Sequence, residues 1–461
     1  MKTTFINARI VTPDQVLEDH CMTVADGYIE RIWRGKSPAA STCGQRGERR
    51  NFAESRSAGR MIADGRPADE RTSCETVVDV RGAYLLPGFI DIHSDMIEGL
   101  LQPRSTAMMD FETGLWEAEK QLAACGITTI FHSVSMFREG SWDAREIRTA
   151  PRVRELADLV DAMGKKPGLI RNRYHLRYEM DNLECYGLVT ELMRQGRVQM
   201  LSLMDHRPGQ GQYRDLNVYR RHLPSAGKDL TDGEFAELVK RETEKPMLTG
   251  EKLFCLAELA HQLGIPLSSH DDDSLERVAE NERLGVSVSE FPISMEVAGA
   301  ARERGIAILL GAPNILLGGS HSGNLSAEEA IRRGCADILC SDYYPQALLR
   351  AVFCLAEKQV VPLYEACRFV SLNPARAAGL SRETGSLEKG KQADFLIVEA
   401  EGYSRPRLLQ TWVSGRAAME LNYGGLCTGT GGQDRAGEQS GPGGQDEAGE
   451  DRVREKGDVT G

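Results

Sequence analysis

The sequence predicts an α/β protein: a (β/α)8 TIM-like barrel joined to a small β-sandwich domain that both chain ends form. Three observations support this fold class. Apolar, β-rich runs alternate with helical stretches through the middle of the chain. There are eight such runs, the strand number of a parallel (β/α)8 barrel. Strand-like segments also lie before the first run and after the last, so they can pair into one separate β domain.

The predicted barrel strands are short apolar runs bounded by polar sequence. They are Phe89–Ile92, Ile127–Val134, Tyr174–Met180, Met200–Met204, Pro266–Ser269, Val286–Phe291, Ile306–Leu310 and Ala336–Leu339. Helical stretches between them include Gly114–Cys125, Val153–Met163, Gly250–Leu263, Leu275–Leu284 and Ala327–Arg333. Ser326 is the expected N-cap of the last of these helices, because two glutamates follow it in the first turn.

The order of these segments divides the chain into four parts. Residues 1–83 and 381–427 are predicted to form the small β domain, and residues 84–380 the barrel. Within the first part, Lys36–Glu75 has little apolar content, and we interpret it as a flexible insertion in a hairpin. Residues 428–461 are acidic and Gly-rich and contain an imperfect duplication, which indicates a disordered tail.

Composition narrows the functional classes. The chain has 461 residues, and its apolar fraction of 41% and charged fraction of 27% are ordinary for a globular protein. A net charge of −12 argues against binding to nucleic acid or to anionic membranes. The N-terminus has no long apolar segment, and the eleven cysteines form no CxxC pair. We therefore expect a cytoplasmic protein with reduced thiols.

Side chains of the metal-ligand type follow several of the predicted barrel strands. The carboxyl ends of parallel barrel strands meet at one mouth, where the active site lies. The candidate metal ligands are His93, Asp95, Glu179, His206, His270 and Asp342. Imidazole and carboxylate suit Zn²⁺ and neighbouring divalent ions. The set predicts one or two divalent ions, with Zn²⁺ as the first choice and Mn²⁺ or Fe²⁺ as alternatives.

The individual histidines and carboxylates differ in how strongly the pattern supports them. His93 and Asp95 are two positions apart, so they are expected to point to the same side at the end of the first strand. The sequence leaves open whether Glu179 bridges two ions or binds one. For His132, at the second strand, the sequence leaves open whether the side chain binds a metal ion or supports a residue that does. Four other histidines lie within predicted helices or strands, and we interpret them as structural or surface residues. They are His20, His175, His222 and His261.

Catalytic and substrate-binding roles follow from chemistry. Asp342 is the candidate to orient a water molecule, accept its proton and pass that proton to the leaving group. Arginines near the predicted mouth suit a phosphorylated substrate, since guanidinium binds phosphate bidentately. The substrate-binding candidates are Arg104, Arg177, Arg207, Arg214 and His321. The Gly-rich loop around His321 could bind phosphate through its backbone N–H groups, or it could be a tight turn, and the sequence does not decide between them.

Several motifs carry a resemblance to a known family. Leu86-Pro87-Gly88-Phe89-Ile90-Asp91-Ile92-His93, Asn373-Pro374-Ala375-Arg376 and the stretch Gly385–Asp394 resemble the amidohydrolase superfamily over essentially the whole folded length. More specific stretches are similar to one branch, the α-D-ribose 1-methylphosphonate 5-triphosphate diphosphatases of phosphonate catabolism. They are His93-Ser94-Asp95 with Glu98 and Pro103-Arg104, Leu203–Gln210, Ser269–Asp272, Gly311–Asn314, Gly318–Asn324 and Ser341–Pro345.

This resemblance implies a metal-dependent hydrolase that cleaves the α–β phosphoanhydride of the ribosyl triphosphate to a 5-phosphate and pyrophosphate. It leaves open a homo-oligomeric state and association with other proteins of phosphonate degradation. The chain departs from the branch at Ser105, where the branch usually has a second proline. Most members of the superfamily have His-x-His after the first strand. In this chain Asp95 replaces the second histidine, and the branch shares this replacement.

Two other functions stay open on the sequence. A hydrolase acting on a cyclic amide, an N-acyl group or a nucleobase would use the same barrel, but would not need several arginines around the mouth. A metal-free, non-catalytic scaffold is the other alternative. The retention of His93, Asp95, His206, His270 and Asp342 argues against the scaffold.

Overall fold

The computed structural model describes residues 2–35, 75–139, 141, 145–223, 230–319 and 324–423. Two predictions fall outside these residues. They are the flexible insertion over Lys36–Glu75, of which the structure describes Glu75 alone, and the disordered tail over residues 428–461.

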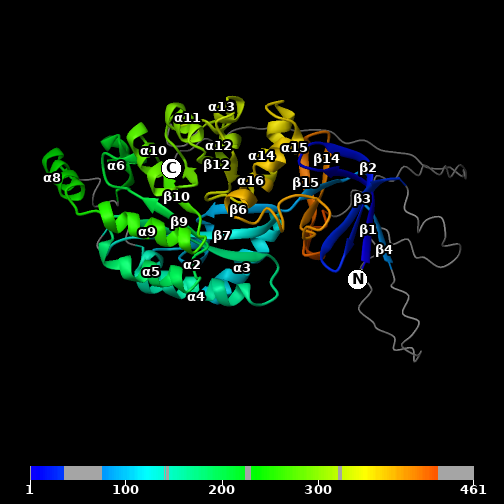
Figure 1. Ribbon diagram of the computed structural model, residues 1–461, viewed down its shortest axis with the longest axis horizontal. Coiled ribbons are helices and arrows are strands. Elements are labelled where there is room, and N and C mark those ends of the chain that lie inside the picture. The colour runs from blue at the N-terminus through cyan, green and yellow to red at the C-terminus, as the bar shows by residue number, and fades with distance from the viewer. Residues whose placement is uncertain are drawn as a thin grey trace, which may run out of the picture. The chain divides into compact units, whose positions relative to one another are not determined.

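Eight parallel strands, hydrogen-bonded in chain order, form the barrel (Figure 1). They are β6 (Phe89–Ser94), β7 (Ile127–Met136), β8 (Arg171–Glu179), β9 (Met200–Met204), β10 (Leu267–His270), β11 (Val288–Glu290), β12 (Ala307–Gly311) and β13 (Ile338–Cys340). The last strand meets the first through a bridge between Ser94 and Asp342. There the Asp342 amide donates to the His93 carbonyl at 3.1 Å, and the Asp95 amide donates to the Asp342 carbonyl at 3.0 Å. The predicted barrel is confirmed.

Helices connect the strands, and most of the longer ones pack against the outside of the barrel. The longer ones are α3 (Phe111–Ala124), α4 (Ala150–Gly164), α5 (Tyr186–Arg194), α8 (Asp232–Thr243), α9 (Gly250–Gln262), α10 (Leu275–Leu284), α11 (Met295–Glu303) and α14 (Ala347–Glu357). The shorter ones are α2 (Met96–Leu101), α6 (Leu216–His222), α12 (Ala312–Leu317), α13 (Ala327–Arg332), α15 (Leu363–Arg368) and α16 (Leu372–Ala377). Ser326 caps α13 as predicted, because its hydroxyl accepts from the Glu329 amide. Within the described residues, no helix combines the length and the apolar character needed to cross a membrane.

The two chain ends form one mixed sheet of eight strands. Its strands are β1 (Lys2–Val11), β2 (Val16–Ala25), β3 (Tyr28–Arg34), β4 (Glu75–Asp79), β5 (Tyr84–Pro87), β14 (Phe395–Glu401), β15 (Ser404–Val413) and β16 (Arg416–Glu420). Antiparallel pairing of β14 with β5 joins the C-terminal strands to the N-terminal ones. In the apolar core of this β domain, the rings of Phe5, Phe395 and Trp412 pack against one another with centroids 4.9 to 5.3 Å apart. This burial of aromatic surface stabilises the β domain.

A buried carboxylate links this sheet to the barrel. Asp394, whose side chain is 1% exposed, pairs with Arg171 of β8 at 2.7 and 3.1 Å. The same carboxylate accepts from the Thr384 hydroxyl at 2.7 Å and from the Ser414 amide at 2.8 Å. The motif Gly385–Asp394 therefore ends in a residue whose donors come from both parts of the fold.

Replacing Asp394 with Asn should lower the free energy of unfolding by about 3 kcal/mol, because breaking one side of a buried ion pair leaves the partner charge uncompensated. Urea denaturation of the wild type and the variant measures the difference. Asp232→Asn is the control, since the Asp232 side chain is 97% exposed. Equal unfolding midpoints for Asp394→Asn and the wild type would contradict a linking role.

Candidate metal-dependent active site

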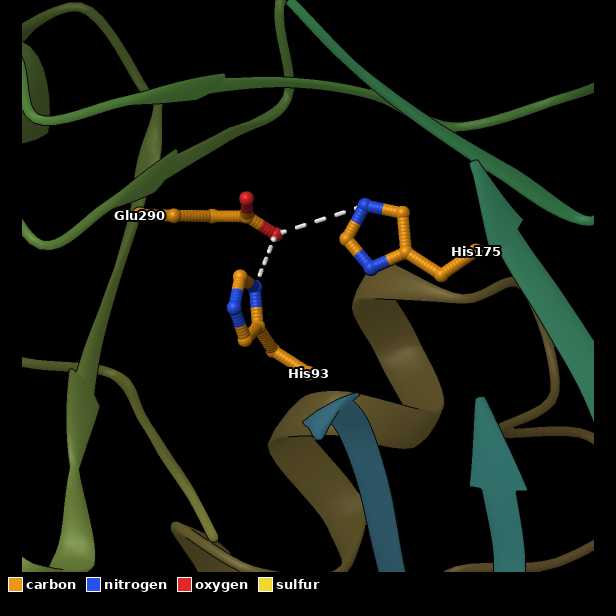
Figure 2. A group of neighbouring side chains, drawn as sticks. All are labelled: His93, His175 and Glu290. Carbon is orange, nitrogen blue, oxygen red and sulfur yellow. Dashed lines mark ion pairs between the residues drawn. The ribbon is translucent and has the colours of Figure 1, made fainter. Parts of the chain in front are cut away.

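Three fully buried side chains from different barrel strands converge at one point (Figure 2). His93 comes from β6, His175 from β8, and Glu290 is the last residue of β11. Oε1 of Glu290 lies 3.2 Å from Nδ1 of His93 and 3.7 Å from Nε2 of His175. We call these residues the inner cluster. Its potential ligand atoms all lie within 4.8 Å of one another.

The surrounding protein orients the inner cluster and leaves its facing atoms without hydrogen bonds. Nδ1 of His175 lies 3.0 Å from the Ile92 carbonyl, which can only accept, so Nδ1 carries the proton and Nε2 keeps its lone pair. Oε2 of Glu290 accepts from the Ser202 hydroxyl at 2.9 Å. The atoms left buried without a partner include Nε2 of His175 and Oε1 of Glu290. Such atoms are costly unless a cation binds them, and a divalent metal fits this donor set.

A second group, the outer cluster, consists of His206, His270 and Asp271. Oδ2 of Asp271 lies 2.9 Å from Nδ1 of His270 and 3.6 Å from Nε2 of His206. On its other side, Nδ1 of His206 is 2.5 Å from Oε1 of Glu179. The His93 and His270 rings are 5.5 Å apart, so the two clusters are neighbours. The arrangement can hold one or two divalent ions.

Electrostatics favour cation binding at both clusters. Burial lowers the pKa of His93 to about 3, so its imidazole is neutral at pH 7, as a ligand must be. Burial alone would raise the pKa of Glu290, but His93 and His175 lower it overall. Burial alone would lower the pKa of His206, but Glu179 and Asp271 raise it to about 10. A divalent ion would displace the proton that His206 otherwise carries.

A cavity of about 250 Å³ opens beside the clusters. Its polar lining includes Asp95, Arg177, His270, Asp271 and Asp342. Burial and the nearby Asp95 raise the pKa of Asp342 to about 7. Arg177 is only 7% exposed. Its guanidinium contacts Nε2 of His270 at 3.2 Å and Sδ of Met204 at 3.3 Å, and among the described carboxylates none forms an ion pair with it.

The backbone is strained where three strands reach this cavity. Asp271, Phe291 and Asp342 follow β10, β11 and β13 and have φ angles of 54°, 56° and 56°. Positive φ is unfavourable for a bulky residue such as Phe291, and strain of this kind clusters at functional sites. The Phe291 ring lies 5.0 Å from the His93 ring and 5.3 Å from the His270 ring. Its strained conformation thus places an apolar wall against both clusters.

The predicted metal ligands lie together at this mouth, although their roles remain predictions. His93 is in the inner cluster, and His206 and His270 are in the outer one. Asp95 and Asp342 line the cavity and belong to neither cluster. Glu179 contacts His206 on the nitrogen that faces away from Asp271, a position that suits orientation of the imidazole.

The predicted substrate-binding residues are less well gathered. Arg177 lines the cavity. Arg207 pairs with Asp205 through two contacts of 2.8 Å, so its guanidinium is already engaged. Arg104 and Arg214 are exposed, and neither lines the cavity. His321 lies outside the described residues.

Three residues of the clusters were absent from the predicted set: His175, Glu290 and Asp271. His175 was interpreted as structural, yet it alternates along β8 with Arg177 and Glu179, and period two places these side chains on one face. Glu290 lies inside the predicted run Val286–Phe291, whereas the observed strand β11 ends at this residue, and Asp271 directly follows His270. Because the predicted run extends one residue beyond the observed strand, a search for ligand-type residues just past each run passed over Glu290.

His132 lies outside both clusters, and its fully buried imidazole bonds Oδ1 of Asn172 at 2.9 Å. Burial lowers its pKa to about 4, below the ordinary value of 6.5. The unfolded chain therefore binds a proton between these values that the folded chain does not. The contribution of His132 to the free energy of unfolding should be fully present above pH 6.5 and should fall by about 3 kcal/mol as the pH drops to 4.

Urea denaturation of metal-free protein at pH 7 and pH 4.5 measures this dependence. The loss of stability between the two pH values should be smaller in His132→Gln than in the wild type. Loss of equal size in both proteins would show that His132 does not carry it.

The sequence is similar to known proteins over most of its length. Residues 222–420 match the model of the amidohydrolase family. The chain is 35% identical to the α-D-ribose 1-methylphosphonate 5-triphosphate diphosphatase of Escherichia coli strain K12 over 364 residues, which are 77% of this chain and 89% of that protein. It is 26% identical to an imidazolonepropionase of Solibacter usitatus over 71% of this chain and 78% of that protein.

Among solved structures, dihydropyrimidinase from Brevibacillus agri superposes with a TM-score of 0.55 at 12% identity, covering 90% of this chain and 95% of that one. N-acetylglucosamine-6-phosphate deacetylase from Pasteurella multocida gives 0.53 at 15% identity, covering 90% and 99%. These two likenesses concern the fold alone. With its barrel, its two histidine–carboxylate clusters and a relative at 35% identity over most of both sequences, the chain belongs to the amidohydrolase family.

Proposed function

We propose that this protein hydrolyses the α–β phosphoanhydride of α-D-ribose 1-methylphosphonate 5-triphosphate, giving the 5-phosphate and pyrophosphate. The relative from Escherichia coli supports this substrate. The structural observation that carries the proposal is Arg177, a buried cation with no carboxylate partner among the described residues, in the cavity beside both clusters and Asp342. A fixed guanidinium suits a phosphoryl group and has no evident use toward a neutral cyclic amide.

The inner and outer clusters would hold the divalent ion or ions, Zn²⁺ as the first choice. Bound there, the metal would supply Lewis acidity and lower the pKa of a water molecule. Arg177 offsets negative charge on the non-bridging phosphoryl oxygens as it accumulates. Glu179 holds His206 in place through the 2.5 Å contact to Nδ1.

Asp342 performs the proton transfer in this proposal. The pKa of this carboxyl is about 7 in the metal-free protein, and as a carboxylate it can accept a proton from the attacking water and pass it to the leaving group. The bridge between Ser94 and Asp342 fixes the backbone of this residue at the closure of the barrel. Its carboxylate is thus held by rigid strands rather than by a free loop.

The test is hydrolysis by metal-loaded protein in water enriched with ¹⁸O. Release of pyrophosphate, with the label in the 5-phosphate, is expected from attack on the α-phosphorus. Label in the pyrophosphate would place attack on the β-phosphorus instead. Turnover of imidazolones, other cyclic amides or nucleobases without any pyrophosphate release from the triphosphate would overturn the proposal in favour of a carbon-centred hydrolase.

A further inference from the structure

We propose that Arg145 and Arg148, held in place by Glu98, form an anion site at the mouth that binds the terminal phosphates of the substrate. This inference rests on the proposed function, because it assigns the part of the substrate that becomes pyrophosphate. It adds two binding residues that the sequence patterns did not identify, and it gives a positioning role to Glu98, which stands in the motif of His93-Ser94-Asp95 with Glu98.

Glu98 makes an unusually rich set of contacts for a buried carboxylate. It lies on α2, three residues beyond Asp95, and is 1% exposed. Nε of Arg148 lies 2.9 and 3.0 Å from its two oxygens, and Nη2 of Arg148 lies 2.7 Å from Oε2. Nη1 of Arg145 also reaches Oε2, at 3.1 Å. One carboxylate therefore fixes two guanidinium groups.

The two arginines lie beside the site described above. The Glu98 amide donates to the Asp95 carbonyl at 2.9 Å, and Asp95 lines the cavity. Arg148 also lies over the Phe137 ring, 5.1 Å from its centroid. Phe137 in turn stacks on the His206 ring with centroids 6.2 Å apart. Arg148 is thus connected to Asp95 on one side and to the outer cluster on the other.

Exposure suits a binding role for both arginines. The side chain of Arg145 is 46% exposed and that of Arg148 is 11% exposed, whereas Glu98 is buried beneath them. Glu98 is therefore a positioning residue, since a ligand would meet the guanidinium groups first. Anchored guanidinium groups lose little conformational entropy on binding an anion. Arg177 lines the cavity and the other two arginines lie outside its lining, so a polyphosphate chain that leaves the cavity would meet cations at both places.

The experiment measures binding of inorganic pyrophosphate to metal-loaded protein by calorimetry, together with kcat and KM for the triphosphate. Arg145→Gln and Arg148→Gln should each weaken pyrophosphate binding about tenfold or more, since each removes a charge-assisted hydrogen bond. KM should rise by a similar factor while kcat stays within a few-fold of the wild type. Glu98→Gln should shift both constants in the same direction, and Arg148→Lys should restore binding only in part.

Arg152→Gln is the matched control. Arg152 lies on the same segment, but it pairs with Glu146 and Glu155 on the surface, so its removal should leave binding unchanged. If the wild type hydrolyses the triphosphate and binds pyrophosphate, yet the Arg145 and Arg148 variants behave like Arg152→Gln, the anion site is wrong and the proposed function stands. If the wild type neither binds pyrophosphate nor cleaves the triphosphate, the proposed function itself fails.

Discussion

Replacing Asp342 with Asn is expected to lower kcat by about 100- to 10,000-fold, the range that positioned general acid–base catalysis contributes. The amide keeps the volume and the cavity position of the side chain but cannot accept and return a proton. Metal content should change little, because Asp342 lines the cavity and belongs to neither histidine–carboxylate cluster. The variant therefore separates proton transfer from metal binding.

Steady-state pyrophosphate release and elemental analysis of the same preparation measure the two quantities. Asp232→Asn, on an exposed side chain, controls for the chemical change alone. Loss of the metal together with the activity in Asp342→Asn would instead make Asp342 primarily a ligand. Full activity in the variant would remove Asp342 from the mechanism.

The barrel was predictable because its strands are encoded locally. Each strand is a short apolar run between polar segments, and helices α3, α4, α9, α10 and α13 lie at or within a few residues of the predicted stretches. The strand-end positions of His93, His206 and His270 followed, since parallel strands bring their carboxyl ends to one mouth. Backbone topology alone is enough for this level of prediction.

The rest depends on side-chain direction and on pairing between distant residues. Arg207 was a reasonable phosphate ligand by its position after β9, but Asp205 two residues earlier engages its guanidinium. His175 was set aside because it lies inside a strand rather than at its end. The pairing of Glu98 with Arg145 and Arg148 spans 47 and 50 residues, and no local pattern marks it.

The other large effect is expected at Glu290. Glu290→Gln preserves the shape of the side chain but removes the negative charge from the inner cluster, which leaves His93 and His175 facing a neutral amide. Loss of residues that only support metal ligands typically costs 10- to 100-fold in affinity, so loss of a ligand itself should cost about 100-fold or more. Turnover should fall at least in proportion to the metal lost.

Competition with a chelator of known affinity measures the metal bound by wild type and variant, and circular dichroism of both metal-free proteins tests that the variant is folded. Glu258→Gln, on the exposed face of α9, is the control for the same chemical change. A variant that retains wild-type metal affinity would exclude Glu290 as a ligand and leave the outer cluster to hold the ion. A variant that loses one of two bound ions would instead assign a separate ion to each cluster, because the outer residues His206, His270 and Asp271 are unchanged by the substitution.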